Sequence, residues 1–195
     1  MAGDLFDVHQ ALFRSAFEAG LEYAAYVATG TPPQQERWER AFSASRLTAS
    51  QKETLSRWTR TMNVLVLSGT WCGDCVRQVP LIARIAEACP QINLRLIDNQ
   101  QHPEVANELR VHGASRVPVA VILSEDFFEV SRFGDRTLSH YRSKAARETG
   151  VACDAGLVGP AEAELALELS EWLDVFERGQ LLLRTSGLLR SRYND

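Results

Sequence analysis

The stretch that decides the fold reads Asn63-Val64-Leu65-Val66-Leu67-Ser68-Gly69-Thr70-Trp71-Cys72-Gly73-Asp74-Cys75. Residues 63–68 form a short, almost wholly apolar run, which indicates a strand buried on both faces. A turn follows, and from residue 73 to 88 the apolar residues return at helical spacing. A strand that leads through a turn directly into an amphipathic helix is typical of α/β proteins, and this one carries two cysteines at the junction.

Further strands and helices are predicted on both sides of this unit. Residues 93–98, 117–123 and 128–133 read as strands, 103–110, 138–147 and 161–178 as helices, and 150–160 as a loop. Upstream, the spacing predicts one long amphipathic helix over 4–28, a second that begins near Pro33, and a third from Thr48 or Ser50 to about Arg60, with Glu53 in its capping box. This order of helices and strands along the chain predicts an α/β fold with a central mixed sheet of about four strands flanked by helices. We expect a single domain over 1–195, made of a helical N-terminal extension (1–60), a core (61–148), and a loop plus C-terminal helix (149–195).

The composition is that of an ordinary globular chain and argues against two classes of partner. Of the 195 residues, 45% are hydrophobic and 24% are charged, and the net charge is −4. The Lys and Arg residues are scattered, so we expect no nucleic-acid partner, because binding phosphates needs clustered basic residues. No apolar run approaches the ~20 residues of a membrane span, and the N-terminus lacks the features of a secretory signal. We therefore expect no membrane partner and a cytoplasmic location.

The two cysteines at the strand-to-helix junction form the candidate site. Cys72 would lie at the N-terminus of the helix, where unpaired backbone N–H groups and the helix dipole stabilise a thiolate and lower its pKa. Cys75 lies one helical turn later, near enough to form a disulfide with Cys72. We expect Cys72 to be the attacking thiolate and Cys75 the buried resolving thiol, with Trp71 shielding the site.

A structural zinc half-site is the main alternative for this pair. Zinc needs four ligands, usually in two close pairs, and the sequence contains no second Cys-x-x-Cys and no closely spaced pair of histidines. We therefore expect no metal. Cys89 and Cys153 are predicted to be inert thiols, and the four histidines, including His140, ordinary surface or satisfied side chains.

The motif Trp71-Cys72-Gly73-Asp74-Cys75 resembles the active-site motif of thioredoxins. Pro80 falls where that family has the proline that kinks the active-site helix, and Arg116-Val117-Pro118 is similar to the family's cis-proline segment, which lies against the active-site sulfurs and pairs with the substrate chain. The stretch 132–136 is similar to bacterial thioredoxin-like proteins that carry the same Gly-Asp pair. The resemblance covers roughly residues 63–147 and implies a thioredoxin-like fold.

Three features depart from the family pattern. Asp74 stands where thioredoxin has a proline, and its negative charge would oppose thiolate formation, so we expect a less acidic Cys72 and a more reducing pair than with proline. The buried aspartate that is thought to help take the proton from the resolving thiol is replaced by Val66, and its lysine partner by Leu94. Asp74 or a water would then have to accept that proton. The third departure is the helical N-terminal extension.

The resemblance implies a thiol–disulfide oxidoreductase that reduces protein or small disulfide substrates through a reversible Cys72–Cys75 disulfide, with a thiol as electron donor. No cofactor beyond this redox-active disulfide is expected. The alternative is a redox-inactive adaptor of the same fold, whose added helices dock a partner. A homodimer interface is one further role for those helices. The residues expected to shape the substrate site are Trp71, Gly73, Asp74, Val117 and Pro118.

Overall fold

The computed structural model describes residues 6–149 and 161–193. Its elements are, in chain order, α1 (Gln10–Ala19), α2 (Tyr23–Ala28), α3 (Pro32–Ala44), α4 (Ala49–Ser56), β1 (Met62–Ser68), α5 (Gly73–Glu87), β2 (Ile92–Asp98), α6 (Pro103–Glu108), β3 (Val119–Leu123), β4 (Glu129–Gly134), α7 (Leu138–Thr149), α8 (Ala161–Thr185) and α9 (Gly187–Tyr193). The predicted loop over 150–160, with Cys153, lies outside the described residues. Among the helices of the described ranges, none combines the length and the apolar character needed to cross a membrane.

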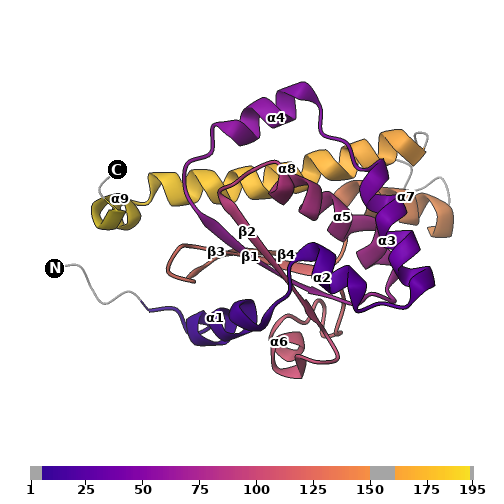
Figure 1. The fold of residues 1–195 in the computed structure, drawn as a ribbon, viewed down its shortest axis with the longest axis horizontal. Coiled ribbons are helices and arrows are strands. Elements are labelled where there is room, and N and C mark those ends of the chain that lie inside the picture. The colour runs from indigo at the N-terminus through magenta and orange to yellow at the C-terminus, as the bar shows by residue number, and fades with distance from the viewer. Residues whose placement is uncertain (1–5, 150–160, 194–195) are drawn as a thin grey trace.

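A four-stranded mixed sheet forms the centre of the fold (Figure 1), with the strand order β2-β1-β3-β4. Strand β1 runs parallel to β2 and antiparallel to β3, and β3 and β4 form an antiparallel pair. All seven residues of β1 are buried, because this strand has a neighbour on each side and helices over both faces of the sheet. The predicted architecture, a mixed sheet flanked by helices with helical extensions at both ends, is confirmed.

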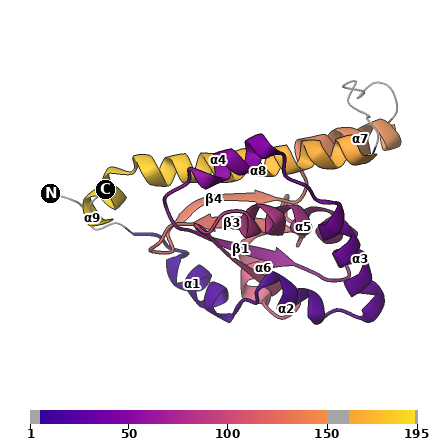
Figure 2. The same cartoon turned by 45° about the horizontal axis from the view of Figure 1, so that its top comes forward.

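The helices form a layer on each side of this sheet, as Figure 2 shows, with α5 and α8 over one face and α1 and α6 over the other. Helix α5 packs on β1 and β2, α8 packs on β4, and α3 packs against α5. Burial of a large apolar side chain contributes about 1.5–3 kcal/mol, so the aromatic residues are the strongest single contributors to this core. The largest fully buried side chains include Trp38, Trp172, Tyr26, Phe13 and Phe176.

The N-terminal extension is joined to the edge of the sheet and does not form the single long helix predicted over 4–28. Helix α1 ends at Ala19, and Leu21 exchanges two backbone hydrogen bonds with Leu96 of β2, at 2.9 and 2.8 Å. Gly20 permits this approach, because a Cβ there would lie 2.8 Å from the Cβ of Arg95. The one-helix prediction was wrong because the chain pairs with backbone groups at the edge of β2 that would otherwise lack partners in the sheet.

Two helix ends also differ from the prediction. Helix α4 begins with a capping box of Thr48 and Gln51, not Glu53: the Gln51 N–H donates to Thr48 Oγ1 at 3.2 Å, and the Thr48 N–H donates to Gln51 Oε1 at 2.9 Å. Helix α8 continues past Gly179, where the sequence predicted its end. A Cβ at Gly179 would lie 3.2 Å from Ile122 Cγ2, so the missing side chain lets α8 pack closely on β3.

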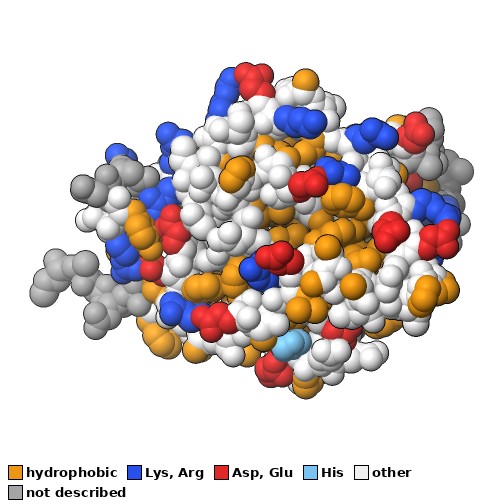
Figure 3. All heavy atoms as spheres, viewed as in Figure 1, with side chains coloured by type: hydrophobic (Ala, Val, Ile, Leu, Met, Phe, Trp, Pro, Cys, Tyr) orange, Lys and Arg blue, Asp and Glu red, His pale blue; other side chains and the backbone are white. Residues whose placement is uncertain are grey.

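One face of the molecule has an apolar hollow. Figure 3 shows hydrophobic side chains gathered in the middle of this face, with charged side chains mostly around them. A pocket of about 400 Å³ lies between α3, α5 and α8, and its lining includes Ser45, Leu81, Leu165 and Leu169. The cysteine pair does not line this pocket, so the candidate chemistry lies elsewhere on the molecule.

Candidate active site

Cys72 is the N-cap residue of α5, directly after the turn that leaves β1. Its backbone is extended, with φ −80° and ψ 125°. Its N–H donates to the Gly69 carbonyl at 3.0 Å, and its own carbonyl accepts from the Val76 N–H at 3.0 Å. The backbone N–H groups of Asp74 and Cys75 lower the pKa of Cys72, as expected of the unpaired donors in the first turn of a helix.

Cys75 lies in the first turn of α5 and is fully buried, whereas Cys72 is partly exposed. Hydrogen bonding from the Cys75 side chain, together with two backbone N–H groups, lowers the pKa of Cys72 to about 6, against the opposing effects of burial and of the Asp74 charge. Burial, and then the same thiol hydrogen bond, raise the pKa of Cys75. Near neutral pH the accessible thiol is therefore ionised and the buried one keeps its proton.

Alkylation kinetics should report this lowered pKa. We expect the rate at which iodoacetamide modifies Cys72 in the reduced protein to rise with a midpoint near pH 6, because the thiolate is the reactive form and a free thiol has a pKa of ~8.5. Asp74→Asn should lower the midpoint further, since it removes a negative charge beside the sulfur. Mass spectrometry across a pH series measures both midpoints, with Glu53→Gln on α4 as the control for losing a carboxylate. A wild-type midpoint at the free-thiol value would contradict the expectation.

Trp71 and the segment before β3 border the sulfur of Cys72. Trp71 is 48% exposed, and its indole folds over Gly69, where a Cβ would lie 2.8 Å from the ring. The Cys72 sulfur lies 3.6 Å from the carbonyl oxygen of Val117, and the Val117–Pro118 peptide bond is cis. The fold thus brings together site residues that the sequence places 45 positions apart.

Two glycines control the space around the pair. A Cβ at Gly73 would meet nothing within 4 Å, so the surface next to Cys72 is open to an approaching chain. At Gly134 a Cβ would lie 2.8 Å from the Pro118 carbonyl oxygen. Strand β4 can therefore pack against the Val117–Pro118 segment only where the residue has no side chain.

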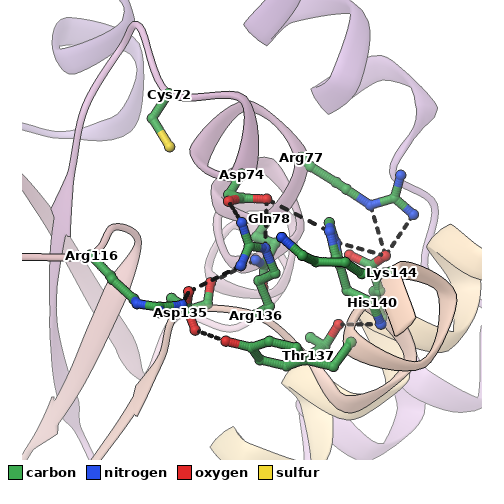
Figure 4. A network of polar contacts seen from close by, with 12 residues as sticks. Cys72, Asp74, Arg77, Gln78, Arg116, Asp135, Arg136, Thr137, His140 and Lys144 are labelled. Carbon is green, nitrogen blue, oxygen red and sulfur yellow. Dashed lines mark hydrogen bonds and ion pairs between the residues drawn. The ribbon is translucent and has the colours of Figure 1, made fainter. Parts of the chain in front are cut away.

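The carboxylate of Asp74 is held by a cation (Figure 4). Arg136 donates from Nε to Asp74 Oδ1 at 3.0 Å, and from Nη1 to Asp135 Oδ2 at 3.3 Å. The His140 Nε2 atom lies 3.6 Å from Asp74 Oδ1. The negative charge that the sequence places beside Cys72 is therefore offset by the guanidinium group of Arg136, which limits its opposition to the thiolate.

His140 and Glu168 extend this network to α8. Glu168 is fully buried and accepts from Arg77 Nε at 2.7 Å, and His140 Nδ1 lies 3.7 Å from Glu168 Oε1. The expectation of an ordinary surface or satisfied histidine at 140 did not single out this position between two carboxylates. No spacing in the sequence relates Arg136, His140 or Glu168 to the cysteines, because the three reach the site from segments that only the tertiary fold brings near α5.

Cys89 lies beyond the opposite end of α5 from the pair. It is buried, and its thiol donates to the Leu55 carbonyl at 3.7 Å. Burial raises its pKa, so it remains a packed, protonated thiol. Within residues 6–149 and 161–193, no group of three or more His, Cys, Asp or Glu side chains is arranged to hold a metal ion.

Comparison with known proteins supports the fold. No curated protein matches the chain. Among solved structures, a protein of unknown function from Pseudomonas aeruginosa is 21% identical with a TM-score of 0.61, and the match covers 84% of this chain and 98% of that chain. An HIV epitope scaffold is 20% identical with a TM-score of 0.60, and that match covers 82% of this chain and 96% of the scaffold. At these identities the likeness concerns the fold alone.

A family model described as Thioredoxin matches residues 20–141. The matched range covers more than half of the chain and includes both cysteines of the pair, the Val117–Pro118 segment and all four strands. It begins just before α2, so most of the N-terminal extension lies inside it. The chain belongs to the thioredoxin family.

Proposed function

We propose that this protein is a thiol–disulfide oxidoreductase whose Trp71–Cys75 motif reduces disulfide bonds in a protein or a small molecule, with a thiol as electron donor. The observation that carries the proposal is the contrast between the two thiols. Cys72 is partly exposed and has a pKa of about 6, whereas Cys75 is buried and has a raised pKa. A reductase needs an accessible thiolate for attack and a second thiol that stays protonated until the mixed disulfide forms.

The exchange takes place in two steps that balance in atoms and electrons. The Cys72 thiolate attacks one sulfur of the substrate disulfide, so that a Cys72–substrate S–S bond forms, the substrate S–S bond breaks and the first thiolate leaves. Cys75 then loses its proton and attacks the Cys72 sulfur, so that the Cys72–Cys75 bond forms and the second thiolate leaves. The substrate gains two electrons and the cysteine pair loses two. A dithiol donor reverses the oxidation of the pair by the same chemistry.

The surroundings of Cys72 support binding of an extended substrate segment. The Val117 carbonyl beside the sulfur offers a backbone acceptor, and the exposed indole of Trp71 offers an apolar contact. Gly73 leaves room for the approaching chain. We propose that the substrate backbone lies along the Val117–Pro118 segment, with Asp74 shaping the charge beside it.

Reduction of insulin disulfides with dithiothreitol as donor tests the proposal. We expect the wild-type protein to accelerate the reduction well above dithiothreitol alone, and its oxidised form to contain a Cys72–Cys75 disulfide in peptide mass maps. Cys89→Ser is the matched control, because it removes a buried cysteine outside the pair, and it should keep the activity. If the wild type adds nothing to the rate with dithiothreitol alone, the reductase proposal fails and the adaptor alternative is favoured.

A further inference from the structure

We propose that Arg116 selects disulfide substrates that carry a carboxylate close to the disulfide bond, because its guanidinium group binds that carboxylate while Cys72 attacks. This inference rests on the proposed function and gives its substrate a chemical class. Arg116 lies outside the Trp71–Cys75 motif, so its part is the choice of substrate and not the attack on the disulfide.

Arg116 directly precedes the backbone group that lies against the attacking sulfur. The next residue is Val117, whose carbonyl oxygen is 3.6 Å from the Cys72 sulfur. Figure 4 shows Arg116 at one end of the polar network, on the same side as Cys72, with His140 toward the other end. A substrate that reaches the sulfur along the Val117–Pro118 segment would therefore pass the side chain of Arg116.

A buried carboxylate holds the Arg116 side chain in place. Arg116 Nη1 donates to Asp135 Oδ2 at 3.0 Å, and the side chain of Asp135 is only 4% exposed. Asp135 is itself fixed from two sides, because its carboxylate accepts from the Tyr141 hydroxyl and its backbone carbonyl accepts from Gln78 Nε2 at 2.8 Å. A guanidinium group that is already oriented loses less conformational entropy when it binds a second carboxylate.

The guanidinium group of Arg116 keeps donors that the protein does not use. Within the described part of the chain its side chain makes no hydrogen bond besides the one to Asp135, and it is 38% exposed. Arg136 differs, because it is 16% exposed and its three side-chain nitrogens all donate to Asp74 or Asp135. A guanidinium group has five N–H donors in a planar fork that matches a carboxylate. Arg116 can therefore bind a substrate carboxylate and keep its contact with Asp135.

The charges around Arg116 favour an anion on its exposed side. The side chains of the two nearby carboxylates, Asp74 and Asp135, are 24% and 4% exposed, and both accept hydrogen bonds from Arg136. The more exposed group of this cluster is therefore the Arg116 cation. The Cys72 thiolate repels an anionic disulfide, and a cation beside the path of approach offsets that repulsion.

The chemical step is that of the proposed function. The Cys72 thiolate forms a bond with one sulfur of the acidic disulfide, the disulfide bond of the substrate breaks, and a carboxylate-bearing thiolate leaves and takes a proton from solvent. Arg116 transfers no proton, because a guanidinium group stays protonated in proteins. The substrate has gained two electrons from the cysteine pair once Cys75 has formed its bond with Cys72.

Three small disulfides of similar length test this preference: dithiodipropionate carries two carboxylates, hydroxyethyl disulfide is neutral, and cystamine carries two ammonium groups. The reduced full-length protein is mixed with each, and mass spectrometry of acid-quenched samples gives the rate of its oxidation. Each rate is divided by the rate at which dithiothreitol reduces the same disulfide, which corrects for intrinsic reactivity. We expect the wild type to prefer the anionic disulfide over the neutral one. Arg116→Gln should lower this ratio about fivefold, as for the loss of an exposed ion pair, and should raise the ratio of cystamine to the neutral disulfide.

Two further variants and added salt separate the charge of Arg116 from its structural contacts. Arg116→Lys keeps the positive charge and should keep part of the preference. Arg57→Gln removes an exposed arginine that pairs with Glu53 on α4, and it should keep the wild-type ratio. At about 1 M salt the Debye length falls to ~3 Å, so the gap between the wild type and Arg116→Gln should narrow.

The outcomes distinguish the inference from the proposed function. A wild-type ratio in Arg116→Gln, an equal loss with all three disulfides, or a gap that salt leaves unchanged overturns the role of Arg116 and leaves the proposed function standing. A wild type that reacts with none of the three disulfides overturns the proposed function itself. Two cyclic peptide disulfides, with aspartate or asparagine beside one cysteine, identify the source of the carboxylate. Preference for the aspartate peptide supports an acidic protein segment, and preference confined to dithiodipropionate supports a small acidic molecule.

Discussion

Replacing Cys72 with serine is expected to abolish disulfide exchange, with a fall in rate of at least about a thousandfold. The Cys72 thiol has a pKa of about 6, whereas a serine hydroxyl does not ionise near neutral pH, so the variant has no nucleophile at the exposed position. Insulin reduction should disappear. A Cys72→Ser variant that kept wild-type activity would contradict the assignment of the nucleophile.

Cys75→Ser is the informative partner of that variant. It should still attack a substrate but stall as a mixed disulfide at Cys72, which mass spectrometry or a non-reducing gel detects, and which can trap substrates in cells. Because the hydrogen bond from the Cys75 thiol is the largest influence that lowers the pKa of Cys72, the alkylation midpoint of Cys72 should rise in this variant. Resolution of the mixed disulfide at the wild-type rate would rule out Cys75 as the resolving thiol.

Arg77→Met is expected to destabilise the protein by about 3 kcal/mol, because it leaves a buried carboxylate without its cation. Arg77 on α5 donates to the fully buried Glu168 of α8 at 2.7 Å, and its Nη2 lies 2.8 Å from Glu164. Methionine keeps much of the apolar length of the arginine side chain but cannot offset the charge. Urea denaturation measures the difference in the free energy of unfolding.

Two further variants separate the lost charge pair from lost packing. Adding Glu168→Leu to Arg77→Met should recover most of the stability, since no buried charge then remains. Glu53→Gln breaks the exposed pair between Glu53 and Arg57 on α4 and should cost less than about 1 kcal/mol. A loss below that value in Arg77→Met would show that the pair does not hold α8 on α5.

Much of the fold could be predicted because its signals are local. The apolar run over 63–68 and the helical spacing after it are properties of neighbouring residues, so the strand and helix that carry the cysteines were correctly predicted. The predicted helix ends were wrong where contacts with distant segments of the chain determine the structure. Leu21 leaves the helix to pair with Leu96, and α8 passes through Gly179 because the helix packs on Ile122. Neither partner is visible in the local pattern.

The candidate site likewise combines features set by the local sequence with features set by contacts between distant segments. The sequence by itself determined the strand, the turn and the Cys-x-x-Cys pair at the start of a helix, because a helix N-terminus and a spacing of one turn are local geometry. Only the tertiary structure decided what surrounds the two sulfurs. Arg136 and His140 beside Asp74, and the Val117 carbonyl beside the Cys72 sulfur, come from separate segments of the chain. The ionisation of a thiol depends on burial and on charges and hydrogen bonds within a few ångströms, and those distances exist only after the chain has folded.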